Sequence, residues 1–102
     1  MINVLIVDDE KIEREGLKYL ISTETKEHKI FEASNGREAL QILREEDIQL
    51  LLTDIKMPHM TGLELSKKAK EDSRIFRSSY SVVSATLHLR RKQYAVVSRN
   101  IS

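Results

Sequence analysis

Residues 51–63 read LLTDIKMPHMTGL and residues 5–10 read LIVDDE, and these two stretches decide the fold. Each begins as an apolar run, which is typical of a strand buried on both faces of a parallel sheet, and each run ends abruptly in carboxylates. In an open α/β sheet, ligands bind outside the carboxyl ends of the strands. If the two strands are neighbours, Asp8, Asp9 and Asp54 therefore meet in one acidic pocket.

The three carboxylates predict a metal site and phosphate chemistry. Clustered carboxylates raise each other's pKa unless a cation compensates them, and an all-oxygen site with few ligands suits Mg²⁺. Asp54 stands alone at its strand end, whereas Asp8 and Asp9 form a pair suited to holding the metal. A carboxylate can attack phosphorus to give an aspartyl-phosphate while a metal neutralises charge on the phosphoryl oxygens. The pocket is therefore suited to phosphoryl transfer.

Each motif also has an ordinary structural explanation when it is taken singly. An Asp-Asp-Glu turn commonly begins a helix and exploits its dipole, and Met57-Pro58 marks a loop that cannot continue a strand. Their conjunction at an interval of about 45 residues favours the site. Spacing excludes two other phosphate-handling folds. Haloacid-dehalogenase-like phosphatases need a second Asp where this chain has Lys56, and the chain has no Gly-x-Gly-x-x-Gly for a dinucleotide.

The two motifs and their interval resemble the receiver domain of two-component response regulators, over about residues 1–72. Residues 9–17 and 54–58 are most similar to receivers that precede an AraC-type DNA-binding domain. The resemblance implies a flavodoxin-like α/β sandwich with three layers and a parallel sheet of expected strand order 2-1-3-4.

The resemblance also implies roles for the acidic residues. Asp54 would be the phosphoacceptor, Asp8 and Asp9 would hold Mg²⁺ together with Asp54, and the backbone carbonyl of Lys56 would supply a further metal ligand. The chain would be a regulator rather than an enzyme, although family receivers promote their own phosphoryl transfer and dephosphorylation. Its partner would be a sensor histidine kinase, and a homodimer is compatible with the family. The alternative is a non-signalling interaction module that keeps the fold without the chemistry.

Composition bounds the remaining properties. A chain of 102 residues with 40% hydrophobic content predicts one domain. It has no cysteine, which excludes a disulfide framework and thiol chemistry. Its apolar runs are short and its N-terminus lacks a basic and then apolar leader, so we expect a cytoplasmic protein without a membrane span.

The chain up to residue 72 reads as a repeated strand–helix unit. We expect strands at residues 2–7, 29–33 and 48–53, and a first helix whose apolar face carries Ile12, Gly16, Leu17, Leu20 and Ile21. Gly16 costs this helix up to about 1 kcal/mol relative to Ala, so its expected purpose is close packing against the sheet. Caps predict two further helices, one opened by Asn35 with Glu38 and one opened by Thr61 with Glu64.

Residues 73–102 differ from the rest of the chain. All 16 acidic residues lie in residues 1–72 beside 11 basic ones, a net charge of −5, whereas residues 73–102 carry six basic residues and no acidic one. We expect a tail translated out of frame after a single-base deletion near codon 73. Permitted codons in the frame one base earlier re-read residues 74–102 as an apolar strand ending in Ser-Gly, a turn and an Ala-Lys-rich helix.

Two other interpretations of the tail stay open. One is a basic nucleic-acid patch on Arg90-Arg91-Lys92, which is disfavoured because so short a run is usually a solvated face. The other is a divergent fourth strand and helix, in which residues 80–85 are β-prone and Ser84 matches the Ser/Thr that receivers carry at the end of their fourth strand.

The sequence therefore predicts a complete phosphoacceptor half and an incomplete readout half. Family receivers contact the phosphoryl group through that Ser/Thr and through a Lys that precedes a Pro at the end of the fifth strand. Ser84 is a candidate for the first role. The chain has no Lys-Pro pair, and Lys92 follows Ser84 too closely to serve. We expect the fifth strand, the last helix and the DNA-binding output domain to be missing, with no nucleic-acid contact by this chain and impaired output.

Overall fold

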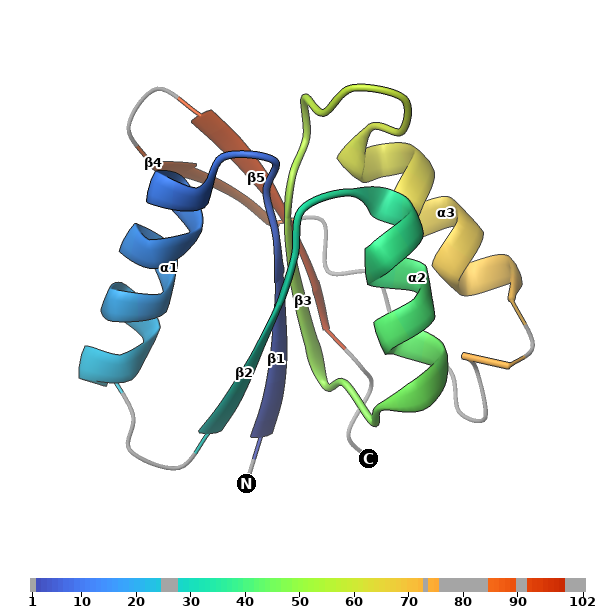
Figure 1. The fold of residues 1–102 in the computed structure, drawn as a ribbon, viewed down its shortest axis with the longest axis horizontal. Helices are drawn as coiled ribbons and strands as arrows, with labels where there is room; N and C mark the ends of the chain where they lie inside the picture. The colour runs from blue at the N-terminus through green and yellow to red at the C-terminus, as the bar shows by residue number, and fades with distance from the viewer. Residues whose placement is uncertain (1, 25–27, 73, 76–84, 90–91, 99–102) are drawn as a thin grey trace.

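The computed structural model (Figure 1) describes residues 2–24, 28–72, 74–75, 85–89 and 92–98. Its elements follow one another along the chain as β1 (Ile2–Val7), α1 (Lys11–Glu24), β2 (His28–Ala33), α2 (Gly36–Glu45), β3 (Leu50–Asp54), α3 (Gly62–Glu71), β4 (Ala85–Leu89) and β5 (Lys92–Ser98). A central sheet separates two helical layers, with α1 over one face and α2 and α3 over the other (Figure 1). This is the three-layer α/β sandwich that the sequence predicts.

The first three strands form a parallel unit in which β1 lies between β2 and β3. Along the chain, α1 connects β1 to β2 and α2 connects β2 to β3, so that the strands can run parallel. Side chains of β1 alternate between the two faces. Leu5 and Val7 pack in the cluster beneath α2 and α3, whereas Val4 and Ile6 pack with Leu17 of α1. The strand is buried on both sides, as its continuous apolar sequence predicts.

The predicted helix caps are present. Asn35 accepts a hydrogen bond from the amide of Glu38 at 2.8 Å. Thr61 and Glu64 form a reciprocal capping box, with both hydrogen bonds at 3.1 Å. These caps satisfy amides that the first helical turn leaves unpaired, and they fix where the chain turns from the sheet into each helix.

Gly16 does not have the role predicted for it. A Cβ built on Gly16 would meet no atom within 4 Å, so the sheet does not approach α1 closely at this residue. Packing against the sheet therefore does not require a glycine at this position.

The sheet beyond β3 differs from the expected arrangement. We expected a fourth parallel strand beside β3 and no fifth strand, but the sheet has five strands in the order β2-β1-β3-β5-β4. The strand beside β3 is β5, which runs antiparallel to it, and β4 pairs antiparallel with β5 at the edge. Only two residues separate β4 from β5 in the sequence, which is enough for an antiparallel pair but too short for the crossover that a parallel pair requires. The 2-1-3 part of the predicted order is confirmed.

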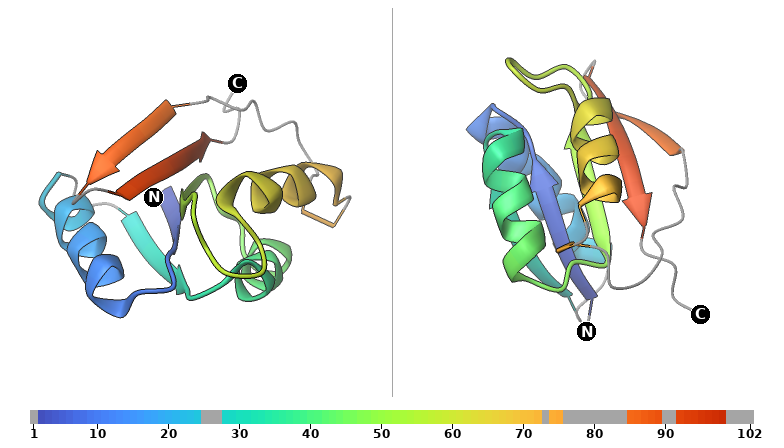
Figure 2. Two further views of the ribbon diagram at one scale, coloured as in Figure 1. Left: turned by 90° about the horizontal axis from the view of Figure 1, so that it is seen from above. Right: turned by 90° about the vertical axis from the view of Figure 1, so that its right-hand side faces the viewer.

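The sequence of β5 explains why it can cover the free edge of β3. Its residues alternate, so that Tyr94 and Val96 join the cluster on the α1 side while Val97 joins the cluster beneath α2 and α3. An unpaired strand edge readily accepts another strand, and β5 offers one that is apolar on both faces. The β4–β5 hairpin leans towards the side of the sheet that α1 covers (Figure 2).

Asp72 marks the point where the tail begins. Its carboxylate accepts hydrogen bonds from Arg44 of α2 at 2.8 Å and from Arg74 at 3.1 Å. The bonds from Arg74 and then Arg44 hold the pKa of Asp72 well below its ordinary value. Asp72 therefore links the end of α3 to α2 and to the first described residues of the tail.

Candidate phosphoacceptor and metal site

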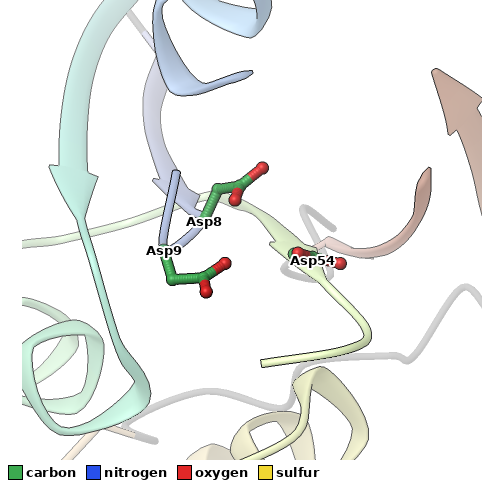
Figure 3. Close-up of side chains that lie close together, drawn as sticks. All are labelled: Asp8, Asp9 and Asp54. Carbon is green, nitrogen blue, oxygen red and sulfur yellow. The ribbon is translucent and has the colours of Figure 1, made fainter. Parts of the chain in front are cut away.

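The structure brings together the three predicted acids. Asp8 and Asp9 follow β1 and Asp54 ends the neighbouring β3, and their carboxylates converge above the sheet (Figure 3). One carboxylate oxygen of each lies within 4.8 Å of the others. Asp8 and Asp54 are buried, whereas Asp9 is exposed. Two acids thus form the floor of the site and the third faces solvent.

Backbone amides hold the two buried carboxylates in place. The Glu10 amide donates to Asp8 Oδ1 at 2.9 Å, and the Lys56 amide donates to Asp54 Oδ1 at 3.1 Å. Arg14 donates from Nη1 to the Asp8 carbonyl at 2.7 Å, which ties α1 to the end of β1. Each acid is therefore oriented by the turn that follows its own strand.

Gly62 sets the path of the loop behind Asp54. Its amide donates to the Ile55 carbonyl at 2.9 Å, and a Cβ at this position would collide with the backbone carbonyl of Asp54. The start of α3 can approach the end of β3 this closely only because residue 62 has no side chain. The Met-Pro-His-Met-Thr-Gly segment therefore positions Asp54 as well as connecting β3 to α3.

Two residues of the tail also belong to the site, and sequence reasoning missed both. Tyr94 is fully buried and donates from its hydroxyl to Asp8 Oδ2 at 2.6 Å. The Lys92 ammonium lies 3.0 Å from Asp8 Oδ1, 3.4 Å from Asp54 Oδ2 and 2.7 Å from Glu10 Oε1.

Lys92 therefore lies at the site, although its spacing from Ser84 predicted that it comes too early to serve as the family's lysine. That prediction assumed a parallel fifth strand whose lysine would come near the end of that strand. The strand is antiparallel, so its first residue lies at the carboxyl end of β3, where Asp54 pairs in register with Tyr94. The charge difference between residues 1–72 and 73–102 is the signal that could have indicated a cation from the tail beside these acids.

The electrostatics of the site follow from burial and from these contacts. Burial raises the pKa of Asp54 above its ordinary value, and the nearby Asp8 carboxylate raises it further. The hydrogen bond from the Lys56 amide and the charge of Lys92 lower this pKa, but the net shift is upward. Burial also raises the pKa of Tyr94, and its hydrogen bond to Asp8 raises it further, so Tyr94 stays a hydrogen-bond donor. Burial lowers the pKa of Lys92, but the hydrogen bonds to Glu10 and Asp8 outweigh it and the net shift is upward.

A pocket of about 460 Å³ opens above Asp54. The residues that line it come from both halves of the chain, namely Asp9, Glu10, Asp54, Lys56, His88, Lys92 and Gln93. His88 and Gln93 contact each other across the hairpin, with 3.0 Å between their nitrogens. The other predicted tail residues, Ser84, Arg90 and Arg91, lie outside the described residues.

Comparison with known proteins identifies similar sequences. The family model of the response regulator receiver domain matches residues 4–98. The transcriptional regulatory protein YdfI of Bacillus subtilis is 46% identical over 71 residues, which is 70% of this chain and 33% of the relative. The aerobic respiration control protein ArcA of Escherichia coli is 38% identical over 73 residues, or 72% of this chain and 30% of the relative. The chain thus spans about a third of the length of these curated relatives.

Two solved structures resemble the fold of this chain. Chemotaxis protein CheY4 of Vibrio cholerae matches with a TM-score of 0.66 and 29% identity, covering 74% of this chain and 61% of that one. A response regulator receiver protein from Pseudomonas putida matches with a TM-score of 0.62 and 32% identity, covering 72% of this chain and 60% of that one. Within the described ranges, no helix has the length and apolar character needed to cross a membrane.

Proposed function

Because the chain belongs to the response regulator receiver domain family, we propose that Asp54 is its phosphoacceptor and that a sensor histidine kinase supplies the phosphoryl group. The observation that carries this proposal is the convergence of Asp54 with Asp8 and Asp9 at the carboxyl ends of adjacent parallel strands. A carboxylate oxygen of Asp54 would form the new bond to phosphorus while the bond from phosphorus to the kinase's histidine breaks. The chain would act as a regulator in the cytoplasm.

Proteins of this family bind Mg²⁺ in an acidic pocket, and the oxygen ligands of the present pocket fit that metal. Three carboxylates with oxygens within 4.8 Å of one another supply hard oxygen ligands, and the exposed side of the pocket leaves room for water. We propose Asp8, Asp9, Asp54 and the backbone carbonyl of Lys56 as the residues that hold it. Bound Mg²⁺ would neutralise charge that develops on the phosphoryl oxygens.

A second candidate function is a receiver-like interaction module without phosphorylation chemistry. The contact that favours it is the Lys92 ammonium, which already compensates Asp8 and Asp54. If this ion pair were permanent, the pocket would need no metal and would accept no phosphoryl group. The two candidates differ in whether Asp54 can be phosphorylated.

Phosphorylation of the full chain distinguishes these two functions. We expect incubation with Mg²⁺ and acetyl phosphate to add one phosphoryl group by intact-protein mass spectrometry, and we expect Asp54→Asn to abolish the addition. Asp47→Asn is the matched control, because Asp47 is an exposed aspartate outside the acidic cluster. Equal labelling of the Asp54 variant would exclude the assignment, and no labelling of the parent chain would favour the interaction module.

A further inference from the structure

Lys92 and Tyr94 occupy the carboxylate oxygens that a metal would use. Asp8 Oδ1 accepts from the Glu10 amide and from Lys92, and Asp8 Oδ2 accepts from Tyr94. Asp54 Oδ1 accepts from the Lys56 amide and Asp54 Oδ2 accepts from Lys92. Within the described residues, every oxygen of the two buried acids therefore already has a donor.

The Lys92 ammonium and Mg²⁺ would compete for the same oxygens. Protein oxygens bind Mg²⁺ at about 2.0–2.1 Å, and Lys92 lies 3.0 Å and 3.4 Å from Asp8 Oδ1 and Asp54 Oδ2. Two cations that shared these oxygens would lie only a few ångströms apart in a largely buried site, where screening is weak. Binding of the metal therefore favours departure of the ammonium.

The backbone keeps Lys92 at the site. Lys92 begins β5, and the β3–β5 ladder holds Asp54 opposite Tyr94, two residues further along that strand. The Lys92 side chain is 20% exposed. A tether of this kind gives the ammonium a high effective concentration at the carboxylates. It is also the only cation that makes ion pairs with Asp8 and Asp54 among the residues that the structure describes.

We propose that Lys92 is a tethered counterion that competes with Mg²⁺ for Asp8 and Asp54. The pocket then has two states, one closed by the lysine and one loaded with metal, in which Lys92 has left the carboxylates. The inference rests on the metal site of the proposed function and adds an autoinhibitory contact to it. Mg²⁺ shifts the equilibrium because it binds only the second state, and in doing so it releases the Lys92 side chain from Asp8 and Asp54.

Calorimetric titration with Mg²⁺ tests the competition in the full chain. We expect Lys92→Met to bind Mg²⁺ at least tenfold more tightly than the parent chain. Lys67→Met is the matched control, because it removes the same charge from an exposed position on α3, and it should change the affinity by less than twofold. Equal or weaker binding by Lys92→Met would overturn the proposal.

A second measurement does not depend on the stability of the variant. In the parent chain, Mg²⁺ should increase the rate at which an amine-reactive acylating reagent modifies Lys92 by severalfold, measured by peptide mass spectrometry, and leave Lys67 unchanged. An unchanged rate at Lys92 under saturating Mg²⁺ would show that lysine and metal coexist, and it would exclude the competition.

The two measurements together separate the failure of this inference from failure of the proposed function. Mg²⁺ binding of equal affinity in the parent chain and both variants would exclude the tethered counterion and leave the metal site intact. No Mg²⁺ binding in any of the three proteins would exclude the metal site, and the competition with it. Binding by Lys92→Met alone would support both.

Discussion

The framework of residues 2–72 and the β4–β5 hairpin are built in different ways. In the framework, helix crossovers join parallel strands, and capping residues fix where α2 and α3 begin. The hairpin adds two antiparallel strands to the edge of that framework without a helix between them. All acidic residues lie in the framework, whereas residues 73–102 supply only basic charge. The hairpin thus pairs with the free edge of β3, and its basic charge is opposite in sign to the net charge of the framework.

This difference shows that the pocket is a composite. The framework contributes the three acids, and the hairpin contributes the ammonium and the hydroxyl that satisfy two of them. The acids could converge without the hairpin, because β1 and β3 already place them together. The hydrogen bonds to the side chains of Asp8 and Asp54 from Lys92 and Tyr94 depend on the hairpin.

The largest expected effect concerns the stability of the hairpin relative to the framework. Strands β1 and β5 both have a neighbour on each side, so their amides are a matched comparison. If the tail was never selected to pack on this framework, we expect amides of β5 to exchange about 100-fold faster than those of β1, equivalent to about 2.7 kcal/mol. Hydrogen exchange followed by mass spectrometry or NMR measures this difference.

Similar protection in β1 and β5 would contradict the out-of-frame interpretation. It would mean that the hairpin unfolds in one cooperative unit with the framework, as expected of an in-frame segment with a divergent sequence. Selective loss of protection in β5 would instead support the division of the chain near Asp72 that the sequence predicts.

The second expected effect concerns the hydrogen bond that joins the two parts at Asp8. Tyr94→Phe removes a buried donor to a carboxylate, and we expect it to lower the free energy of unfolding by about 1.5–3 kcal/mol. Urea denaturation measures the loss. Tyr19→Phe is the control, because Tyr19 is 69% exposed, and its effect should stay within about 0.5 kcal/mol. Equal effects in both variants would show that the hydrogen bond from Tyr94 to Asp8 does not stabilise the protein in solution.

The predictability of the fold follows the same division. Apolar runs, Asn35 and the Thr61–Glu64 capping box are local signals, so they predict the first three strands and the second and third helices directly. The convergence of Asp8 and Asp54 is also predictable, because it requires only that two parallel strands end at the same edge of the sheet.

The position of Lys92 could not be predicted in this way. It depends on the direction of β5, and strand direction is set by pairing between residues far apart in the sequence rather than by local pattern. The interpretation of the spacing between Ser84 and Lys92 presupposed a parallel fifth strand, and therefore it did not place Lys92 at the site. Gly16 and Gly62 show a related limit, since both lie in helices but only Gly62 approaches another backbone closely.

These two glycines form a matched pair whose expected effects on stability have opposite signs. Gly16→Ala should raise the free energy of unfolding by up to about 1 kcal/mol, because it adds helix propensity where a Cβ meets no atom within 4 Å. Gly62→Ala should lower it by about 1–3 kcal/mol, because the same Cβ would push against the backbone of Asp54. Urea denaturation of both variants measures the two signs. A stabilising Gly62→Ala would show that the start of α3 can move away from β3, and in that case Asp54 would be held by its own turn alone.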